Sequence, residues 1–222
     1  VKSLYAAFAK RMRDEVGVKF QAVIYQQAAD YEGVINVKNK VLDEGADEAS
    51  MVYWTLGVAA GTAVNASATN KIYDGEFTVD VDYTQAQLES AIKAGEFTFH
   101  QVGSDVRVLS DINSLVTTTA NKGDIFKDNQ TIRVCDQIAT DIANLFVTKY
   151  LGVVPNDASG RTSLWADIVK HHEDLQNIRA IENFTDEDVT VAQGDTKKSV
   201  VVTDNITVVN TMEKLYMTVY VA

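Results

Sequence analysis

The spacing of hydrophobic residues predicts alternating helices and strands in the first part of the chain. Apolar residues at helical spacing predict an amphipathic helix over 4–16, which Gly17 ends. Runs rich in β-branched and aromatic residues predict strands at 20–25 and 31–39. A buried helix is expected over 47–60, with acidic residues in its first turn, where they complement the helix dipole. This alternation indicates a fold of the α+β class, with mixed sheets packed by amphipathic helices.

A capping box marks the clearest predicted helix, from Thr84 to Gly95. Thr84 is placed to cap the first turn, Gln87 follows three residues later, and the glycine closes the helix. Within 97–112, apolar and polar residues alternate on both sides of a Gly-Ser pair. The second pattern predicts a β-hairpin.

The second half of the chain begins with two predicted helices and continues as strands. Apolar residues recur every three or four positions over 131–151, giving one apolar stripe. A loop containing 155–161 separates this helix from a second one over 163–177, and the two helices are expected to pack together. Strands are predicted over 188–194, 199–205 and 214–222.

The last predicted strand has no polar face. Its residues alternate between two sets that both lack charge: Leu215, Met217, Val219 and Val221 on one side, and Tyr216, Thr218 and Tyr220 on the other. Such a strand is typical of a position covered on both sides. An internal strand of the chain's own sheet and a strand given to another chain both fit this pattern.

Composition favours a folded, soluble protein. The 222 residues are 46% hydrophobic with one proline, which is enough for one or two compact domains. No apolar run approaches the roughly 20 residues that span a bilayer, so no membrane contact is expected. The net charge of −11 argues against nucleic-acid binding. The single cysteine, Cys135, indicates synthesis in the cytosol, and the start at Val1 is interpreted as a truncated boundary.

The pattern of reactive residues predicts no metal or cofactor. The three histidines are His100, His171 and His172, and the adjacent pair lacks the spacing of a zinc-binding helix, so we expect it on a helix surface. Cys135 lies on an apolar stripe, which is typical of a buried small hydrophobe and not of a nucleophile.

Motifs for hydrolysis and for nucleotide binding are both missing from the sequence. No serine lies in a Gly-x-Ser-x-Gly elbow, and no glycine-rich phosphate loop is present. A carboxylate pair such as Asp136 with Asp141 remains open, since sequence distance says little about spatial distance. No catalytic residue is therefore predicted, and a carboxylate-based hydrolase is kept as an alternative.

The order of several segments resembles the contractile tail sheath family of phage tails, R-type bacteriocins and prophage tail particles. Each segment alone is weakly specific, but together they span nearly the whole chain in family order. They are YEGVINVKN (31–39), WTLGVAAGTAVNASATNKIY (54–73), LESAIKAGEFTF (88–99), VRVLSDINSL (106–115), IRVCDQIATDIANLF (132–146), YLGVVPNDASGR (150–161) and MEKLYMTVYV (212–221).

The resemblance implies a structural subunit and not an enzyme. Sheath subunits polymerise around an inner tube and contract to drive it through a cell envelope, without nucleotide or cofactor. The implied partners are neighbouring sheath subunits, the tail tube protein, and baseplate and terminator proteins, in a virion tail or tail-like particle assembled in the host cytoplasm. A different phage tail protein, an adaptor or tube subunit, is the second alternative.

The resemblance also assigns regions and residues. It implies a first α/β part at 1–115 and a C-terminal sheath domain at 116–222, with an N-terminal region and its extended arm upstream. Family arms exchange strands between subunits by β-augmentation, and the segment that matches the terminal strand runs from Leu215 to Val221. Lys149, Arg161 and Lys170 are the implied candidates for contact with the tube.

Overall fold

A computed structural model describes residues 1–221 of the protein. The chain divides into two compact units: unit 1 comprises Val1–Ile132 and Asn210–Ala222, of which Ala222 lies outside the described residues, and unit 2 comprises Arg133–Val209. Helices and small sheets occur in both, which confirms the predicted α+β class. The predicted boundary between 115 and 116 concerns the family's domains and stays a prediction.

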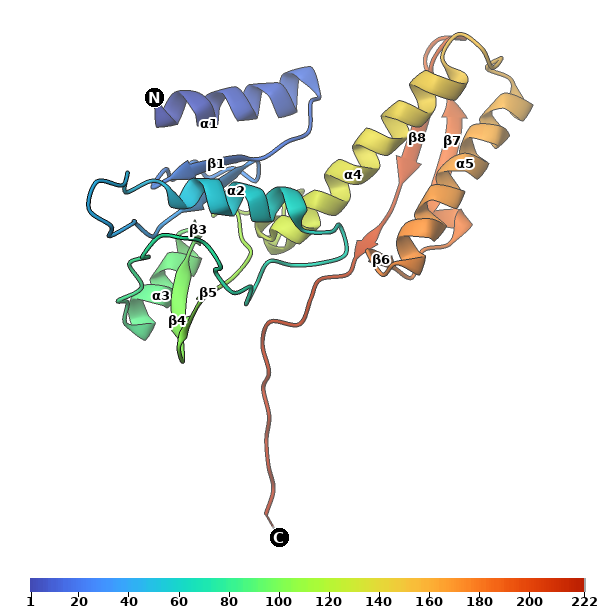
Figure 1. Cartoon of the computed structure of the whole chain (residues 1–222). Helices are drawn as coiled ribbons and strands as arrows, with labels where there is room; N and C mark the ends of the chain where they lie inside the picture. The colour runs from blue at the N-terminus through green and yellow to red at the C-terminus, as the bar shows by residue number, and fades with distance from the viewer. Residues whose placement is uncertain (222) are drawn as a thin grey trace. The chain divides into compact units, whose positions relative to one another are not determined.

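Unit 1 is built on a three-stranded parallel sheet with a hairpin beside it (Figure 1). The order β1-β2-β3 pairs Ala22 with Val34 and Val37 with Phe97. Its core gathers Phe97, Phe99, Met51 and other fully buried side chains. The elements are α1 (Lys2–Arg11) with a π-helical turn (Met12–Val16), β1 (Ala22–Tyr25), β2 (Val34–Val37), α2 (Met51–Gly61), α3 (Gln85–Lys93), β3 (Glu96–Phe97), β4 (Phe99–Val102), β5 (Asp105–Val108) and a 3-10 turn (Asp124–Lys127).

The local signals in unit 1 are mostly confirmed. Thr84 and Gln87 form the predicted capping box at the start of α3, and β4 pairs with β5 as an antiparallel hairpin. The helix predicted from 47 was wrong in its start, because it begins at Met51 with no acidic residue in its first turn. Asp47 instead accepts a hydrogen bond from the Ala49 amide ahead of the helix. The helix is also only half buried, since Tyr53 is exposed.

Unit 2 packs helices against a two-stranded antiparallel sheet (Figure 1). β7 pairs with β8, in a register that places Val191 opposite Val202, and a second short pair joins β6 and β9. The elements are α4 (Asn129–Leu145), whose first residues belong to unit 1, its π-helical continuation (Phe146–Tyr150), α5 (Ala158–Asn177), β6 (Ile181–Glu182), a 3-10 turn (Asp186–Asp188), β7 (Val189–Gln193), β8 (Val200–Asp204) and β9 (Thr207–Val208).

The predicted loop at 155–161 is wrong in its second half, because α5 already begins at Ala158. Asp157 caps the helix by accepting a hydrogen bond from the Gly160 amide at 2.8 Å. Gly160 then lies so close to the preceding turn that an added Cβ would stand 2.0 Å from the Pro155 carbonyl oxygen. The turn-forming residues of this segment therefore form the N-terminal end of α5.

The end of the chain forms no strand within the described residues, although a strand was predicted over 214–222. The backbone from 210 to 221 pairs with no strand of residues 1–221, and Ala222 lies outside them. Interpreting this segment as an internal strand of the chain's own sheet is therefore wrong. Residues 214–221, called the tail below, are exposed throughout, with Leu215 85%, Tyr216 89% and Val219 68% accessible.

Candidate subunit interface

The outer edge of β8 carries backbone groups without partners among residues 1–221. The Gly194 amide bonds the Ser199 carbonyl and the Asn205 amide bonds the Asp188 carbonyl. Hydrogen-bonded and non-hydrogen-bonded pairs alternate along an antiparallel ladder. With these two bonds at the ends of the ladder, the N–H and C=O groups of Val200 and Val202 point away from β7. Neither residue has a backbone partner elsewhere among residues 1–221. β8 is therefore an open edge.

The opposite edge of the same sheet, on β7, is covered at one end. The Trp165 indole N–H on α5 donates to the Val189 carbonyl of β7 at 3.0 Å. β7 also has the larger contact with α5, which lies over it (Figure 1). The Val189 acceptor of β7 is therefore occupied, whereas the outward backbone groups of Val200 and Val202 on β8 have no such partner among residues 1–221.

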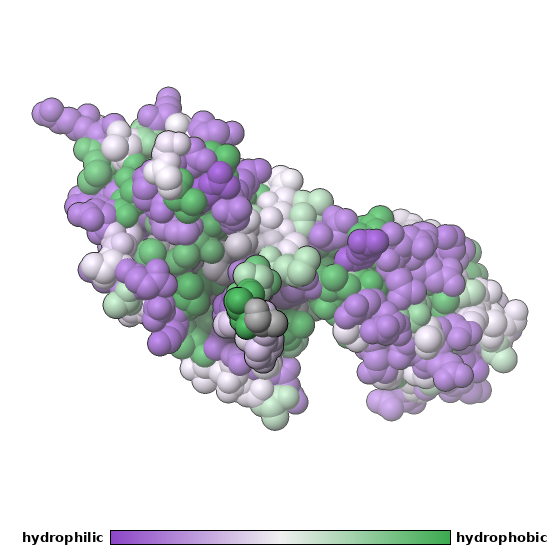
Figure 2. Space-filling view, turned by 90° about the horizontal axis from the view of Figure 1, so that it is seen from below, coloured by the Kyte–Doolittle hydropathy of each residue, from purple (hydrophilic) through white to green (hydrophobic). Residues whose placement is uncertain are grey.

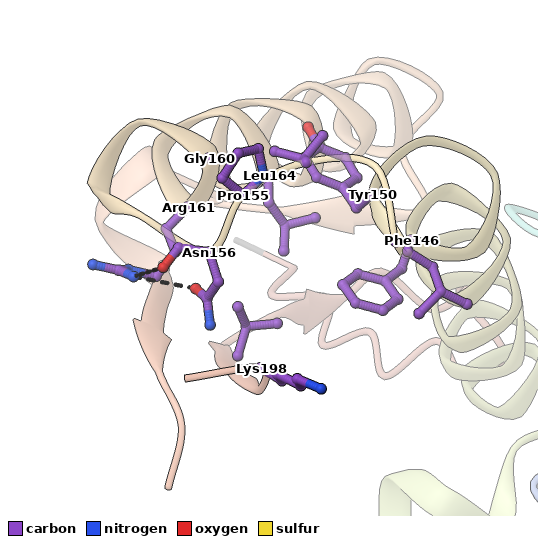
Figure 3. A pocket seen from close by; sticks show the side chains of 12 residues that line it. Phe146, Tyr150, Pro155, Asn156, Gly160, Arg161, Leu164 and Lys198 are labelled. Atoms are coloured by element: carbon purple, nitrogen blue, oxygen red, sulfur yellow. Dashed lines mark hydrogen bonds between the residues drawn. The ribbon is translucent and has the colours of Figure 1, made fainter. Parts of the chain in front are cut away.

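An apolar groove runs beside the open edge, between β8 and the helices of unit 2. It has a volume of about 450 Å³, and we call it the β8 groove. Its end continues into a smaller pocket of about 100 Å³, where Phe146, Tyr150, Pro155 and Leu164 face one another and Arg161 bonds Asn156 (Figure 3). The larger apolar residues that line the β8 groove are Ile142, Phe146, Leu164, Ile168, Val200 and Val202.

One histidine–aspartate pair joins α5 to β8, and a second joins α5 to α4. His172 is fully buried, and its Nε2 lies 2.8 Å from an Asp204 oxygen while its Nδ1 faces the Ile168 carbonyl. His171 Nε2 lies 2.9 Å from an Asp141 oxygen, and the Nδ1 atoms of the two histidines are 3.2 Å apart. The prediction that both histidines lie on a helix surface is wrong for His172, because β8 covers it.

Replacing His172 by alanine should destabilise unit 2 by about 2–4 kcal/mol. The change removes a fully buried ring and leaves the Asp204 carboxylate without its partner. Thermal and urea unfolding of the intact chain measure the effect. Lys170→Ala on the same helix is the matched control, since its exposed ion pair with Asp174 is worth under about 1 kcal/mol. A His172 variant as stable as the control would contradict this role.

The tail offers the complementary surface. Figure 2 looks along the tail from below and shows hydrophobic side chains there without covering atoms. Side chains on both faces of the tail are exposed, from Leu215 to Val221. Exposed apolar groups of this extent usually mark an interaction site.

The three predicted tube contacts already have neighbours of their own. Lys149 pairs with Asp167 at 2.5 Å, and Lys170 pairs with Asp174 at 2.8 Å. Arg161 donates to the Asn156 carbonyl and side chain. Burial, and then a hydrogen bond to Asp167, raises the pKa of Tyr150 beside this cluster. Lys149 and Lys170 are solvent-exposed, and their role stays a prediction.

The described residues hold no arrangement that resembles a metal centre. Within residues 1–221, no group of three or more histidine, cysteine or acidic side chains could hold a metal ion. Asp141 is engaged by His171 and by Gln137. Among the same residues, no helix is both long and apolar enough to cross a bilayer.

Comparison with known proteins places this architecture in one family. Residues 1–114 match the phage tail sheath protein central domain, and residues 121–222 match the phage tail sheath C-terminal domain. The chain belongs to the phage tail sheath family, which confirms the resemblance found in the sequence.

Individual relatives agree with the family match. Over 233 residues the chain is 33% identical to the phage-like element PBSX protein XkdK of Bacillus subtilis, covering 100% of this chain and 50% of that protein. The sheath tail protein of Desulfitobacterium hafniense is 39% identical, with a TM-score of 0.85 over 97% of this chain and 52% of that one. The contracted helical sheath of the anti-feeding prophage is 14% identical with a TM-score of 0.75, covering 99% and 66% of the chains, and shares the fold. The chain spans about half the length of the curated relatives it matches.

Proposed function

We propose that this chain is the polymerising part of a contractile tail sheath subunit, which assembles around an inner tube and shortens to drive it through a cell envelope. Family membership supports the sheath assignment. The observation that carries the proposal is that the chain has two matching exposed features. One is the apolar tail, and the other is the open β8 edge with an apolar groove beside it.

The tail of one copy is the proposed occupant of the β8 edge of another. The added strand would bond the free backbone groups of Val200 and Val202, and one of its faces would lie in the β8 groove. Its other face is also apolar, which fits further cover within the polymer. Backbone bonds hold such a link even when the side-chain interfaces between subunits slide.

The proposed role is structural, and contraction draws on energy stored during assembly. The polar pocket of unit 1 supports a structural role over a hydrolase, since hydrogen bonds of its carboxylates hold the chain segment before the tail. We further propose neighbouring sheath subunits, a tube protein and baseplate and terminator proteins as partners, in a virion tail or tail-like particle assembled in the host cytoplasm. Lys149, Arg161 and Lys170 stay the proposed tube contacts.

Electron microscopy of the complete gene product tests this function. Sheath subunits should form hollow tubular polymers wide enough to enclose a tube. The readout separates a sheath from an adaptor or a tube subunit, which would give rings or narrow tubes. Globular particles at all concentrations would overturn the proposal.

A further inference from the structure

Side-chain hydrogen bonds fix the segment that precedes the tail to unit 1. We call residues 210–213 the tail root. Asn210 Nδ2 donates to Asp128 Oδ2 at 2.7 Å, and the Thr131 hydroxyl donates to Asn210 Oδ1 at 3.3 Å. The Thr211 amide donates to Gln130 Oε1 at 3.1 Å. The root is therefore held by residues at the start of α4.

The end of the root is held from a different part of unit 1. The Thr69 hydroxyl donates to one Glu213 carboxylate oxygen at 2.5 Å, and the Ser110 hydroxyl donates to the other at 3.1 Å. Immediately after Glu213 the tail is exposed. The contacts of the root thus set the point from which the free tail leaves unit 1.

These contacts bring negative charges together. A polar pocket of about 340 Å³ is lined by Asp111, Asp128 and Glu213, with Lys214 as its one positive lining residue among those described. Asp111 accepts hydrogen bonds from the Ala68 amide and the Asn129 side chain. Asp128 accepts from an amide of the root itself. Closing the root on unit 1 therefore places the Glu213 charge near a second, partly buried carboxylate.

We propose that the tail root is a proton-linked clamp: uptake of one proton by Asp128 closes the root on unit 1, and loss of that proton frees it. Freeing the root would let the tail change the direction in which it leaves unit 1. This consequence for strand exchange rests on the proposed function, whereas the clamp itself is a property of the single chain.

The electrostatic environment of Asp128 supports the sign of this linkage. Burial, and next the charge of Glu213, raises the pKa of Asp128 from 3.8 to about 6. When the root is released, Asp128 regains water and loses Glu213, so its pKa returns toward the ordinary value. The closed state binds more protons between these two values, so the clamp is tightest at low pH and weakens as pH rises through about 6.

Hydrogen exchange of the Thr211 amide measures the clamp in the intact chain. Because this amide is bonded to Gln130 only when the root is closed, its protection factor, corrected for the intrinsic rate, reports the opening equilibrium. From pH 5 to pH 8 the protection should fall about tenfold. The Phe99 amide, which is bonded to the buried Asn39 side chain, is the internal reference and should show no comparable fall.

Three variants separate the clamp from general loosening. Asp128→Asn cannot ionise but can still accept from Asn210, so Thr211 should stay protected at both pH values. Asp124→Asn, which changes an exposed carboxylate paired with Lys127, should keep the tenfold change. Glu213→Gln removes the opposing charge and should reduce the pH dependence.

Three results would overturn the clamp: a flat profile in the parent chain, a retained pH dependence in Asp128→Asn, or an equal fall at Phe99. Failure here leaves the sheath assignment untouched, because no step of this experiment involves assembly. Conversely, a pH-dependent root in a chain that never polymerises would contradict the proposed function alone.

Discussion

Replacing Val219 by proline should abolish tubular polymers while leaving the chain folded. Within residues 1–221 the tail pairs with no strand, and Val219 is 68% exposed, so its replacement should change the free energy of unfolding by less than about 0.5 kcal/mol. In an exchanged strand, proline removes an N–H donor and distorts the ladder. A loss of about 1–3 kcal/mol per contact weakens association roughly tenfold to a hundredfold, and the loss recurs at each subunit.

Val219→Thr is the matched control, since it keeps the N–H group and the β-branched shape. It should form polymers close to the parent level. Electron microscopy and sedimentation measure assembly, and thermal unfolding measures the fold. Global unfolding of the proline variant, or normal polymers from it, would each contradict the assignment of this tail as an exchanged strand.

Proline should have different effects at two adjacent positions of β8, the strand proposed to accept the tail. Val202 turns its N–H away from β7, so Val202→Pro should leave the β7–β8 pair intact and yet block assembly, as in the tail variant. Val201 is opposite Ala192 in a pair that alternation makes hydrogen-bonded. Val201→Pro should therefore break the hairpin and lower the stability of unit 2 by about 3 kcal/mol or more.

These two variants test directly which residues of β8 turn their N–H groups toward β7. Circular dichroism and urea unfolding report the fold, and microscopy reports assembly. If both variants unfold unit 2, β8 does not present its Val202 edge to solvent. If Val202→Pro assembles normally, the tail does not pair with this edge.

Local signals made much of this fold predictable. The capping box of Thr84 and Gln87 and the alternation around β4 and β5 each depend on residues close in sequence, and both are confirmed. The start of α5 was missed because Asp157 and Gly160 belong equally to turns and to helix caps. Only the conformation of the chain decides between those uses.

The site depended on contacts that the sequence does not reveal. His172 was taken for a surface residue because its partner, Asp204, is 32 positions away on β8. The absence of polar faces in the tail was visible from the sequence, but the choice between an internal and a donated strand was not. The exposed tail and the open β8 edge support the proposal of a donated strand, which stays a prediction.

The most direct measurement mixes two forms of the chain. A ¹⁵N-labelled chain ending at Glu213 supplies the acceptor without a tail, and the unlabelled intact chain supplies the tail. The sheath account predicts that the amide signals of Val200 and Val202 shift and gain hydrogen-exchange protection as intact chain is added, and that the Val219→Pro chain has no such effect. Unchanged β8 amides at concentrations where the intact chain self-associates would contradict it.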